Sequence, residues 1–435
     1  MTQDHASRRR RRLTATVTDL EIPIQRAFLV GVELPGITTD DAARSLEELT
    51  LLTDTAGSEP IDQELVRRNR IDAATYIGSG KADELASLTR ALDIDVVVFD
   101  NPLSPAQQRN LQELFDCDVV DREALILDIF AQHATTKVGS VQVELALLRY
   151  NLPRLRGKGK ALSQQAGGIG TRGPGETKLE TDRRRILQRI SKLERELKET
   201  ERHRATQRKA RNKSEIPQVA IVGYTNAGKS TLLNALTEAD VLVEDRLFAT
   251  LDSTVRRLEL PDHRPLLIAD TVGFVRRLPH RLVEAFQSTL AEVAEATLLV
   301  HVVDGSDPDP TGQMAAVREV LHEIDAASVP ELLVFNKSDQ FPDNAKTRLD
   351  NLYPNGVVIS ARDGEGLETL LERIADMLEQ KMITLTLEVP YDRGDVVAAA
   401  HRVGEVIEEK YDDAGTILEL RVPESAAAGF LEFSK

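Results

Sequence analysis

The chain has 435 residues, of which 41% are hydrophobic, and a formal net charge of −16, a composition typical of globular proteins. No run approaches the roughly 18 apolar residues of a membrane span, and the single cysteine, Cys117, excludes a disulfide framework and a cysteine-based zinc site. We therefore expect about three domains in a cytoplasmic protein, at most peripheral to a membrane and never stably inserted in it.

Residues 1–23 are polar and then basic, and they lack the apolar core of a secretory signal, so we expect a disordered basic tail. Over residues 24–133, short apolar strands alternate with amphipathic helices, which predicts a small parallel α/β domain. The predicted strands are 28–32, 75–77, 96–99 and 119–120, and the predicted helices are 40–51, 82–92, 105–114 and one from Arg122.

The segment Gly78–Lys81 imitates a phosphate-binding loop within this domain. Thr75 stands where the first glycine is required, and Ala82 follows the lysine in place of serine or threonine. These departures favour a turn with an exposed lysine over a second nucleotide site.

Residues 134–212 are predicted to form a basic helical hairpin. One apolar stripe comprises Val141, Leu145 and Leu148. The second, spaced four, three and four residues apart, comprises Ile186, Ile190, Leu193 and Leu197. This spacing is typical of a coiled-coil seam, so we expect the two helices to pair in antiparallel fashion.

Positive charge is concentrated in this hairpin. Residues 154–213 carry nineteen Lys and Arg against seven Asp and Glu, which favours contact with RNA phosphates over the alternative of a solvated charged helix. The loop at 167–177 has five glycines and is either a hinge or an element that approaches folded RNA. The candidate RNA-binding residues are Gly168, Arg172, Gly173, Arg183, Arg184 and Arg185.

The segment 223–230 follows an apolar run at 219–222 and precedes a helix-forming stretch, the context of a triphosphate-binding loop. Lys229 is predicted to bridge the outer phosphates, and the Ser230 hydroxyl to bind Mg²⁺. The candidate nucleotide-binding residues here are Gly223, Tyr224, Thr225, Asn226, Ala227, Gly228, Lys229 and Ser230.

Two downstream segments are predicted to respond to the γ-phosphate. The first comprises Phe248, Ala249, Thr250, Leu251 and Asp252, in which Thr250 is the expected second metal ligand; Thr254 is an alternative that spacing does not exclude. The second comprises Asp270, Thr271, Val272 and Gly273. We expect Asp270 to hold Mg²⁺ through water and Gly273 to sense the γ-phosphate. Lys229, Thr250 and Gly273 are therefore the predicted catalytic residues.

Phe274 stands where many signalling GTPases carry a glutamine that orients the attacking water. A phenyl ring cannot position water, so we expect slow intrinsic hydrolysis that a partner or another domain accelerates. Asn226 has two interpretations, a ligand that helps to hold K⁺ or an ordinary loop residue.

The base is predicted to be guanine. A buried strand at 331–335 leads into Asn336, Lys337, Ser338 and Asp339, and a strand at 357–359 leads into Ser360, Ala361 and Arg362. The Asp339 carboxylate can accept both hydrogens from the N1 and N2 edge of guanine, whereas adenine would leave it unpaired. We place this nucleotide domain at 213–382 and a small α+β domain, without a catalytic constellation, at 383–435.

Several segments together resemble the HflX family of GTPases. They are Thr75–Glu84, Leu103–Arg109, Asp121–Phe130, Gly167–Thr177 and Lys178–Arg183, together with the nucleotide-binding motifs. The resemblance covers about residues 24–385. It implies a GTP hydrolase of the translation-factor class that is monomeric when free, binds the large ribosomal subunit and dissociates or rescues stalled ribosomes under stress. The alternatives are a signalling GTPase that acts on proteins and an RNA-remodelling NTPase.

Overall fold

A computed structural model describes eleven stretches of the chain: residues 24–155, 174–212, 216–237, 247–248, 254–276, 287–342, 344–379, 382–412, 415–423, 427 and 429–434. Within the long helix at 174–212, side chains are described for residues 180–200 and 202. The chain divides into two compact units, Met1–Arg122 and Glu123–Lys435. The predicted tail at 1–23 and the residues Gly168, Arg172 and Gly173 lie outside the described residues.

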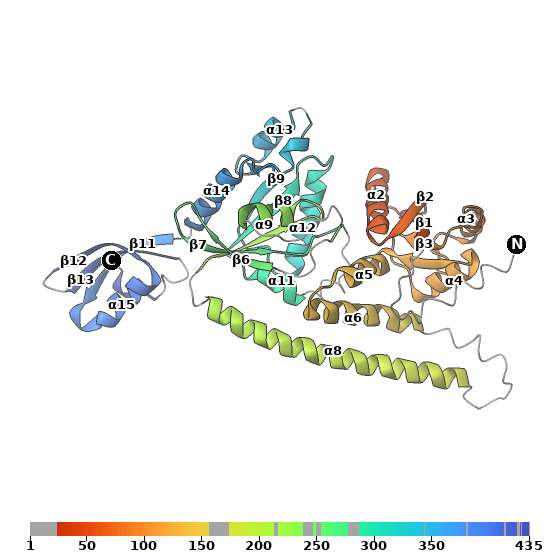
Figure 1. Ribbon diagram of the computed structural model, residues 1–435, viewed down its shortest axis with the longest axis horizontal. Helices are drawn as coiled ribbons and strands as arrows, with labels where there is room; N and C mark the ends of the chain where they lie inside the picture. Colours follow the sequence, from red (N-terminus) through yellow and green to blue (C-terminus); the bar gives the residue numbers. More distant parts are fainter. Residues whose placement is uncertain are drawn as a thin grey trace. The chain divides into compact units, whose positions relative to one another are not determined.

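The first unit is a parallel sheet with helices on both faces (Figure 1). Its elements are β1 (Gln25–Glu33), α2 (Thr39–Thr55), β2 (Ser58–Arg67), α3 (Ser79–Ala91), β3 (Val96–Phe99), α4 (Pro105–Phe115) and β4 (Asp118–Asp121), and the strand order is β2-β1-β3-β4. Alternate residues of β1 face opposite sides, so Phe28 packs with α3 and α4, while a Cβ on Gly31 would touch Leu46 of α2. The predicted parallel α/β fold is confirmed.

The strand predicted at Thr75–Ile77 is wrong. The backbone there is a turn: Asp72 Oδ1 accepts hydrogen bonds from the amides of Ala74 and Thr75, at 2.9 and 2.8 Å. The strand that joins the sheet is β2, whose sequence is largely polar, contains Pro60 and shows no alternation typical of a strand. An edge strand can have this composition because one of its sides needs no partner strand.

A buried ion cluster at the end of this unit connects Arg122 to α2 and to the residue after β3. Arg122, with 3% of its surface exposed, contacts Asp100 Oδ1 at 2.6 Å and Glu48 Oε2 at 3.2 Å. Its guanidinium also donates to the Ser45 carbonyl oxygen at 2.7 Å. Because each charge has a close partner, the cluster avoids the cost of an isolated buried ion.

Helix α5 (Arg122–His133) starts at the last residue of the first unit and continues into the second, where it is followed by α6 (Lys137–Asn151), a short 3-10 helix, η1 (Leu152–Leu155), and the long α8 (Pro174–Asn212). Helices α6 and α8 lie side by side (Figure 1). Their seam contains all seven residues of the two predicted stripes, so the predicted pairing is confirmed: Val141, Leu145, Leu148, Ile186, Ile190, Leu193 and Leu197.

The predicted nucleotide domain contains a six-stranded sheet in the order β10-β9-β8-β5-β7-β6, parallel except for β6. Its elements are β5 (Gln218–Gly223), α9 (Lys229–Thr237), β6 (Thr254–Glu259), β7 (Pro265–Asp270), α11 (Gln287–Ala294), β8 (Leu298–Asp304), α12 (Pro310–Glu323), β9 (Glu331–Asn336), η2 (Ser338–Gln340), α13 (Ala345–Leu352), β10 (Val357–Val358) and α14 (Leu367–Glu379). Helices α9 and α14 pack on one face of the sheet, and α12 and α13 on the other. Because β5, β7 and β9 run parallel, the loops that follow them meet at one edge of the sheet.

The last part of the chain is a three-stranded antiparallel sheet with one helix on one face. Its elements are β11 (Met382–Pro390), η3 (Tyr391–Arg393), α15 (Gly394–Val403), β12 (Glu405–Tyr411), β13 (Gly415–Pro423) and η4 (Leu431–Phe433), in the order β11-β13-β12. Leu387, Val389, Leu418 and Leu420 are buried against α15, as the alternation in the sequence predicts.

Candidate functional site: a phosphate loop joined to a base-recognition loop

The loop between β5 and α9 requires two glycines because other strands approach its backbone closely. Gly223 has φ +154°, and a Cβ on it would lie 2.2 Å from the Val302 carbonyl oxygen. Gly228 has φ +89°, and its Cβ would lie 2.2 Å from Asn336 Nδ2. A larger residue at either place would displace the loop that presents amides at the start of α9.

Lys229 is buried at the start of α9. Its Nζ donates to the Tyr224 carbonyl oxygen at 2.8 Å, so the side chain folds back over the loop. Burial lowers the pKa of Lys229 to about 8, and the carboxylate of Asp270 acts in the opposite direction. A bound anion would restore to the ammonium the interactions that it loses with water.

Ser230 and Asp270 are in direct contact. The Ser230 hydroxyl donates to Asp270 Oδ2 at 2.8 Å, and Asp270 Oδ1 accepts from the Thr271 amide at 2.9 Å. Both oxygen types are hard ligands that suit Mg²⁺. The described part of the chain has no group of three or more His, Cys, Asp or Glu arranged so that it could hold a metal ion, so a cation here would need phosphate or water oxygens to complete its shell.

The segment after Asp270 is hydrogen-bonded to the phosphate loop. The Phe274 amide donates to the Gly223 carbonyl oxygen at 3.1 Å, and the Phe274 carbonyl oxygen accepts from the Thr225 amide at 2.7 Å. The Phe274 side chain is 1% exposed. Gly273, directly before it, lies close to both Thr225 and Lys229.

Asn336 joins the phosphate loop to the predicted base-recognition loops. Its Nδ2 donates to the Ala227 carbonyl oxygen at 2.9 Å, and its Oδ1 accepts from the Ala361 amide at 2.9 Å. Asn336 is 3% exposed, and both of its partners are buried. Three segments more than 20 residues apart in sequence are thus held by one amide side chain.

The base-recognition loops also bond to each other. The Ser338 amide donates to the Ile359 carbonyl oxygen at 3.1 Å, and the Ser360 hydroxyl lies 3.0 Å from Asp339 Oδ1. Asp339 itself is exposed, as is Arg362, whereas Lys337 pairs with Asp304 at 2.7 Å. The Asp339 carboxylate is therefore held in place on one side and accessible on the other.

Of the first predicted switch segment, only Phe248 lies within the described residues; Ala249, Thr250, Leu251 and Asp252 lie outside them. Phe248 is 2% exposed and has φ +61°. Its ring meets Phe130 of α5 edge-on, with centroids 4.7 Å apart. The alternative residue, Thr254, begins β6 and pairs with Asp270 in the strand ladder.

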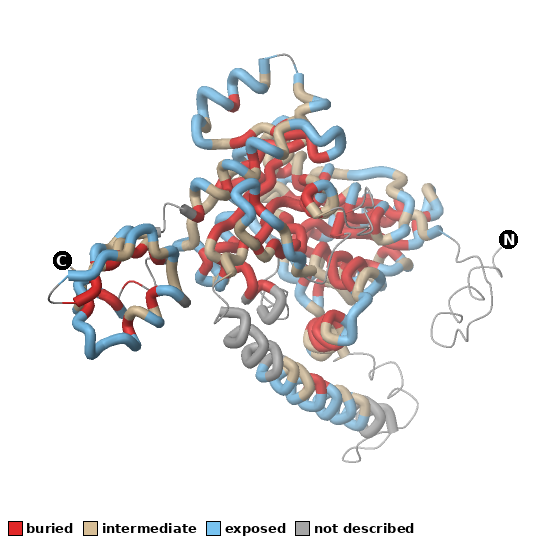
Figure 2. The backbone as a smooth tube through the Cα atoms, turned by 60° about the vertical axis from the view of Figure 1, so that its left-hand side comes forward, coloured by how far each residue is buried: buried red, intermediate tan, exposed pale blue. Residues whose placement is uncertain are grey.

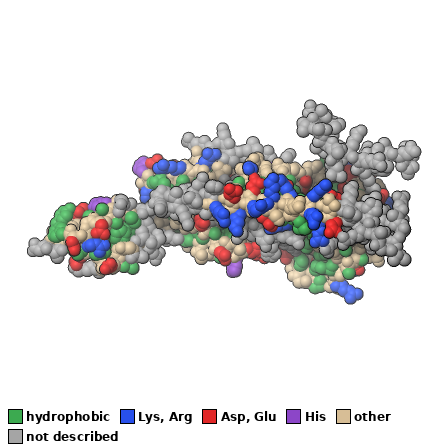
Figure 3. Space-filling model, turned by 90° about the horizontal axis from the view of Figure 1, so that it is seen from below, with side chains coloured by type: hydrophobic (Ala, Val, Ile, Leu, Met, Phe, Trp, Pro, Cys, Tyr) green, Lys and Arg blue, Asp and Glu red, His purple; other side chains and the backbone are tan. Residues whose placement is uncertain are grey.

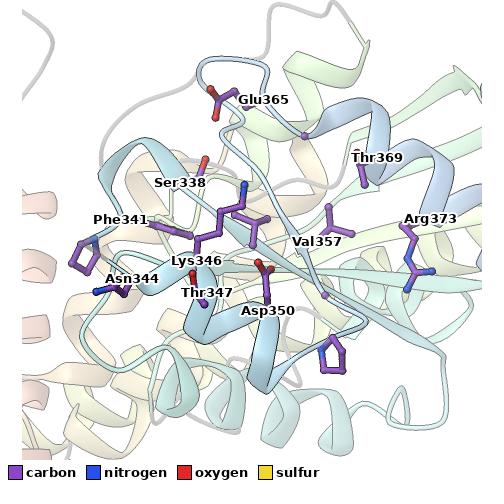
Figure 4. Close-up of a pocket in the computed structure, with 15 residues that line it drawn as sticks. Ser338, Phe341, Asn344, Lys346, Thr347, Asp350, Val357, Glu365, Thr369 and Arg373 are labelled. Carbon is purple, nitrogen blue, oxygen red and sulfur yellow. The ribbon is translucent and has the colours of Figure 1, made fainter.

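A pocket of about 760 Å³ opens beside the base-recognition loops (Figure 4). Ser338 and Glu365 line the side nearest those loops, and Lys346, Asp350 and Arg373 come from α13 and α14. None of the residues 223–230 lines it. The hollow is therefore distinct from the phosphate-binding loop.

The described part of α8 is exposed apart from its seam (Figure 2). Lys and Arg side chains follow it in Figure 3, with Asp and Glu among them. Arg189 is paired with Glu144 at 2.6 Å, but Arg183 and Arg184 have no ion-pair partner among the described residues and are exposed. These two guanidinium groups are available to an external anion.

Sequence reasoning missed three contacts around the site. The Arg276 amide donates to the Tyr224 hydroxyl at 2.8 Å, and the Arg276 side chain pairs with Asp309 at 2.6 Å. Phe130 packs against Phe248. These partners are far apart in sequence, so no local spacing could reveal them. The only signal in the sequence was Tyr224 itself, an aromatic residue with a hydroxyl inside a loop of small residues.

Comparison with known proteins decides the family. Models described as GTP-binding GTPase N-terminal, GTP-binding GTPase Middle Region and 50S ribosome-binding GTPase match residues 43–131, 133–211 and 218–337. GTPase HflX of Caldanaerobacter subterraneus is 46% identical over 92% of this chain and 91% of its own length. The chain belongs to the HflX family of GTPases. GTPase HflX of Escherichia coli is 43% identical over 92% of this chain and 94% of its own length.

Among solved structures, a GTP-binding protein from Sulfolobus solfataricus in complex with GDP is 24% identical, with a TM-score of 0.44, over 81% of this chain and 98% of that chain. The assignment to HflX rests on the sequence relatives. It confirms the resemblance seen in the motifs and identifies the chain as a GTP-binding P-loop GTPase. Within the described ranges, every helix is too short or too polar to cross a bilayer.

Proposed function

We propose that this HflX-family GTPase binds the large ribosomal subunit, hydrolyses GTP faster there than when free, and dissociates or rescues stalled ribosomes under stress. The observation that carries the proposal is the exposed, unpaired arginine pair Arg183 and Arg184 on a helix packed beside α6, in a chain whose residues 218–337 match a 50S ribosome-binding GTPase model. Guanidinium groups suit RNA phosphates because they donate in a fixed fork. The protein would act as a monomer in the cytoplasm.

In this proposal the phosphate loop at 223–230 holds the triphosphate. Lys229 binds the outer phosphates, the Gly273 amide detects the γ-phosphate, and Thr250 closes over the metal in the GTP-bound state. The Asp339 carboxylate selects guanine, with the backbone at 360–362 around the base carbonyl. The Asn336 bridge supports this assignment because it sets the distance between the two loops.

The Ser230 hydroxyl and the Asp270 carboxylate fit Mg²⁺, since their oxygens lie 2.8 Å apart at the end of β7. We propose Ser230 and Thr250 as direct ligands and Asp270 as a ligand through water. Bound Mg²⁺ neutralises charge on the β- and γ-phosphates. Asn226 is exposed with φ +58°, which suits either a K⁺ ligand or a plain loop residue. Equal rates of GTP hydrolysis in K⁺ and Na⁺, measured with ribosomes present, would exclude the K⁺ ligand.

Five segments make up the proposed domain plan: a tail at 1–23, an α/β domain at 24–133, the basic hairpin at 134–212, the nucleotide domain at 213–382 and the α+β domain at 383–435. Within the hairpin, Arg183, Arg184 and Arg185 contact ribosomal RNA, together with Gly168, Arg172 and Gly173 of the glycine-rich loop. Deleting 168–175 should then weaken ribosome binding without affecting nucleotide binding.

The central test is sedimentation of the full chain with purified large subunits, in the presence of a non-hydrolysable GTP analogue and across a salt series. Replacing Arg183, Arg184 and Arg185 by glutamine should weaken binding and reduce the slope of log affinity against log salt by up to about three, roughly one unit for each lost phosphate contact. GTP hydrolysis measured with and without the subunits should show stimulation in the wild type and less in the variant.

The matched control is Arg149→Gln, which removes a partly exposed arginine whose charge is already paired with Glu194 at 2.8 Å. It should leave the salt slope unchanged. Co-sedimentation of the triple variant at wild-type affinity would mean that α8 does not contact RNA. Absence of any binding by the wild type would remove the ribosome from the proposal and favour a signalling GTPase.

A further inference from the structure

The group that should orient the attacking water is absent from its usual place. Phe274 occupies that position, its side chain is buried, and both of its backbone groups are bonded to the phosphate loop. A buried phenyl ring offers neither a donor nor an acceptor. If this loop hydrolyses GTP, another polar group close to Gly273 must hold the water.

Thr225 carries such a group. The residue is 6% exposed, and its hydroxyl is fully buried without a hydrogen-bond partner among the described residues. Most buried hydroxyls in folded proteins are paired, and an unpaired one calls for an explanation such as a ligand or water that completes it. Valine has the same shape and would avoid this cost.

The Thr225 side chain lies beside Gly273 and Lys229. A Cβ built on Gly273 would lie 2.7 Å from Thr225 Cγ2 and 3.1 Å from Lys229 Nζ, so the three residues converge on one point. The Thr225 hydroxyl is bonded to the same carbon as the methyl that faces Gly273. Lys229 and Gly273 are the residues assigned above to the outer phosphates.

We propose that the Thr225 hydroxyl contacts the attacking water and holds it in line with the γ-phosphate, replacing the missing glutamine. A hydroxyl both donates and accepts hydrogen bonds, so it can accept a hydrogen bond from the water while donating one to a phosphate oxygen, or it can donate a hydrogen bond to the water's oxygen. The inference rests on the proposed GTP hydrolysis at this loop and adds to it the residue that positions the nucleophile.

In the step itself, the water oxygen forms a bond to the γ-phosphorus as the bond to the β–γ bridging oxygen breaks. The electron pair of the broken bond stays on GDP, and both water protons end on the released phosphate as dihydrogen phosphate. Thr225 is unchanged at the end, so its role is positioning through hydrogen bonds and requires no further reactant.

The test compares Thr225→Val, which removes the hydroxyl at constant shape, with Thr225→Ser, which retains it. Single-turnover GTP hydrolysis by the full chain should fall at least about tenfold in the valine variant, the rate equivalent of about 1.4 kcal/mol. The serine variant should recover most of that loss. Affinities of the valine variant for GDP and for a non-hydrolysable GTP analogue should stay within about twofold of the wild type, whereas its complex with GDP and aluminium fluoride should weaken in parallel with the rate.

A control for burying valine is Thr53→Val, because Thr53 is also buried but already donates to the Leu49 carbonyl oxygen, and it belongs to the first unit whereas Thr225 belongs to the second. It should hydrolyse GTP at the wild-type rate. A wild-type rate in Thr225→Val, an equal loss in Thr225→Ser, or an equal loss of GDP affinity would each overturn the proposal. Failure of the wild type to bind or hydrolyse GTP would instead overturn the proposed function.

Discussion

Removing the Asn336 side chain should loosen the phosphate loop and the base-recognition loops together. Asn336→Ala deletes the hydrogen bonds to the Ala227 carbonyl oxygen and the Ala361 amide, both 2.9 Å long. Each partner is then a buried polar group without its bond, at a cost of about 1–3 kcal/mol. Because loops relax partly, we expect a loss of about 2–4 kcal/mol in local stability, which corresponds to a roughly 30- to 1000-fold larger equilibrium constant for local opening.

Native-state hydrogen exchange suits this prediction because it reports local opening in a chain that has more than one domain. Amides in 219–237 and in 357–361 should lose protection together in Asn336→Ala. In the matched control, Asn110→Ala, an exposed side chain loses one 2.9 Å bond to the Ala74 carbonyl oxygen, so changes should stay near that loop and within about 0.5 kcal/mol. Wild-type exchange at both segments in Asn336→Ala would refute the bridge as a stabilising element.

Three further predictions concern nucleotide binding. Asp339→Asn should shift preference from GTP toward XTP by reversing the hydrogen bonding at the purine 2-position; competition binding would show it, and unchanged GTP affinity would contradict it. Since burial lowers the pKa of free Lys229 to about 8, the amine is mostly neutral above that pH, so GDP binding near pH 9 should take up a proton. Calorimetry in buffers of different ionisation enthalpy measures this uptake, and a buffer-independent heat would exclude it. Thr250→Ala should abolish the GTP-specific state but preserve GDP affinity. The ratio of the affinities for GDP and for a GTP analogue measures this effect. If Thr254→Ala shows the effect instead, Thr254 and not Thr250 is the metal ligand.

The parts of this molecule that sequence predicts are those with a short repeat or a fixed motif. The seam of α6 and α8 follows from apolar residues spaced three and four apart, and the phosphate loop from glycines at fixed positions after a strand. The sequence did not predict strand β2, because an edge strand needs no alternating pattern of polar and apolar residues. The ion cluster around Arg122 was not predicted for another reason. Its partners Glu48 and Asp100 lie 74 and 22 residues away in the sequence, and only the folded sheet brings them together.

The end of α8 and the beginning of β5 are separated by only five residues, 213–217. Such a connection spans at most about 18 Å even when fully extended. Gly223, at which the phosphate loop starts, is the last residue of the same strand. A displacement of the end of α8 by more than this length would therefore have to move β5 and the loop after it as well. Lengthening this connection with a flexible insert would remove that restraint and would leave the residues of both elements unchanged.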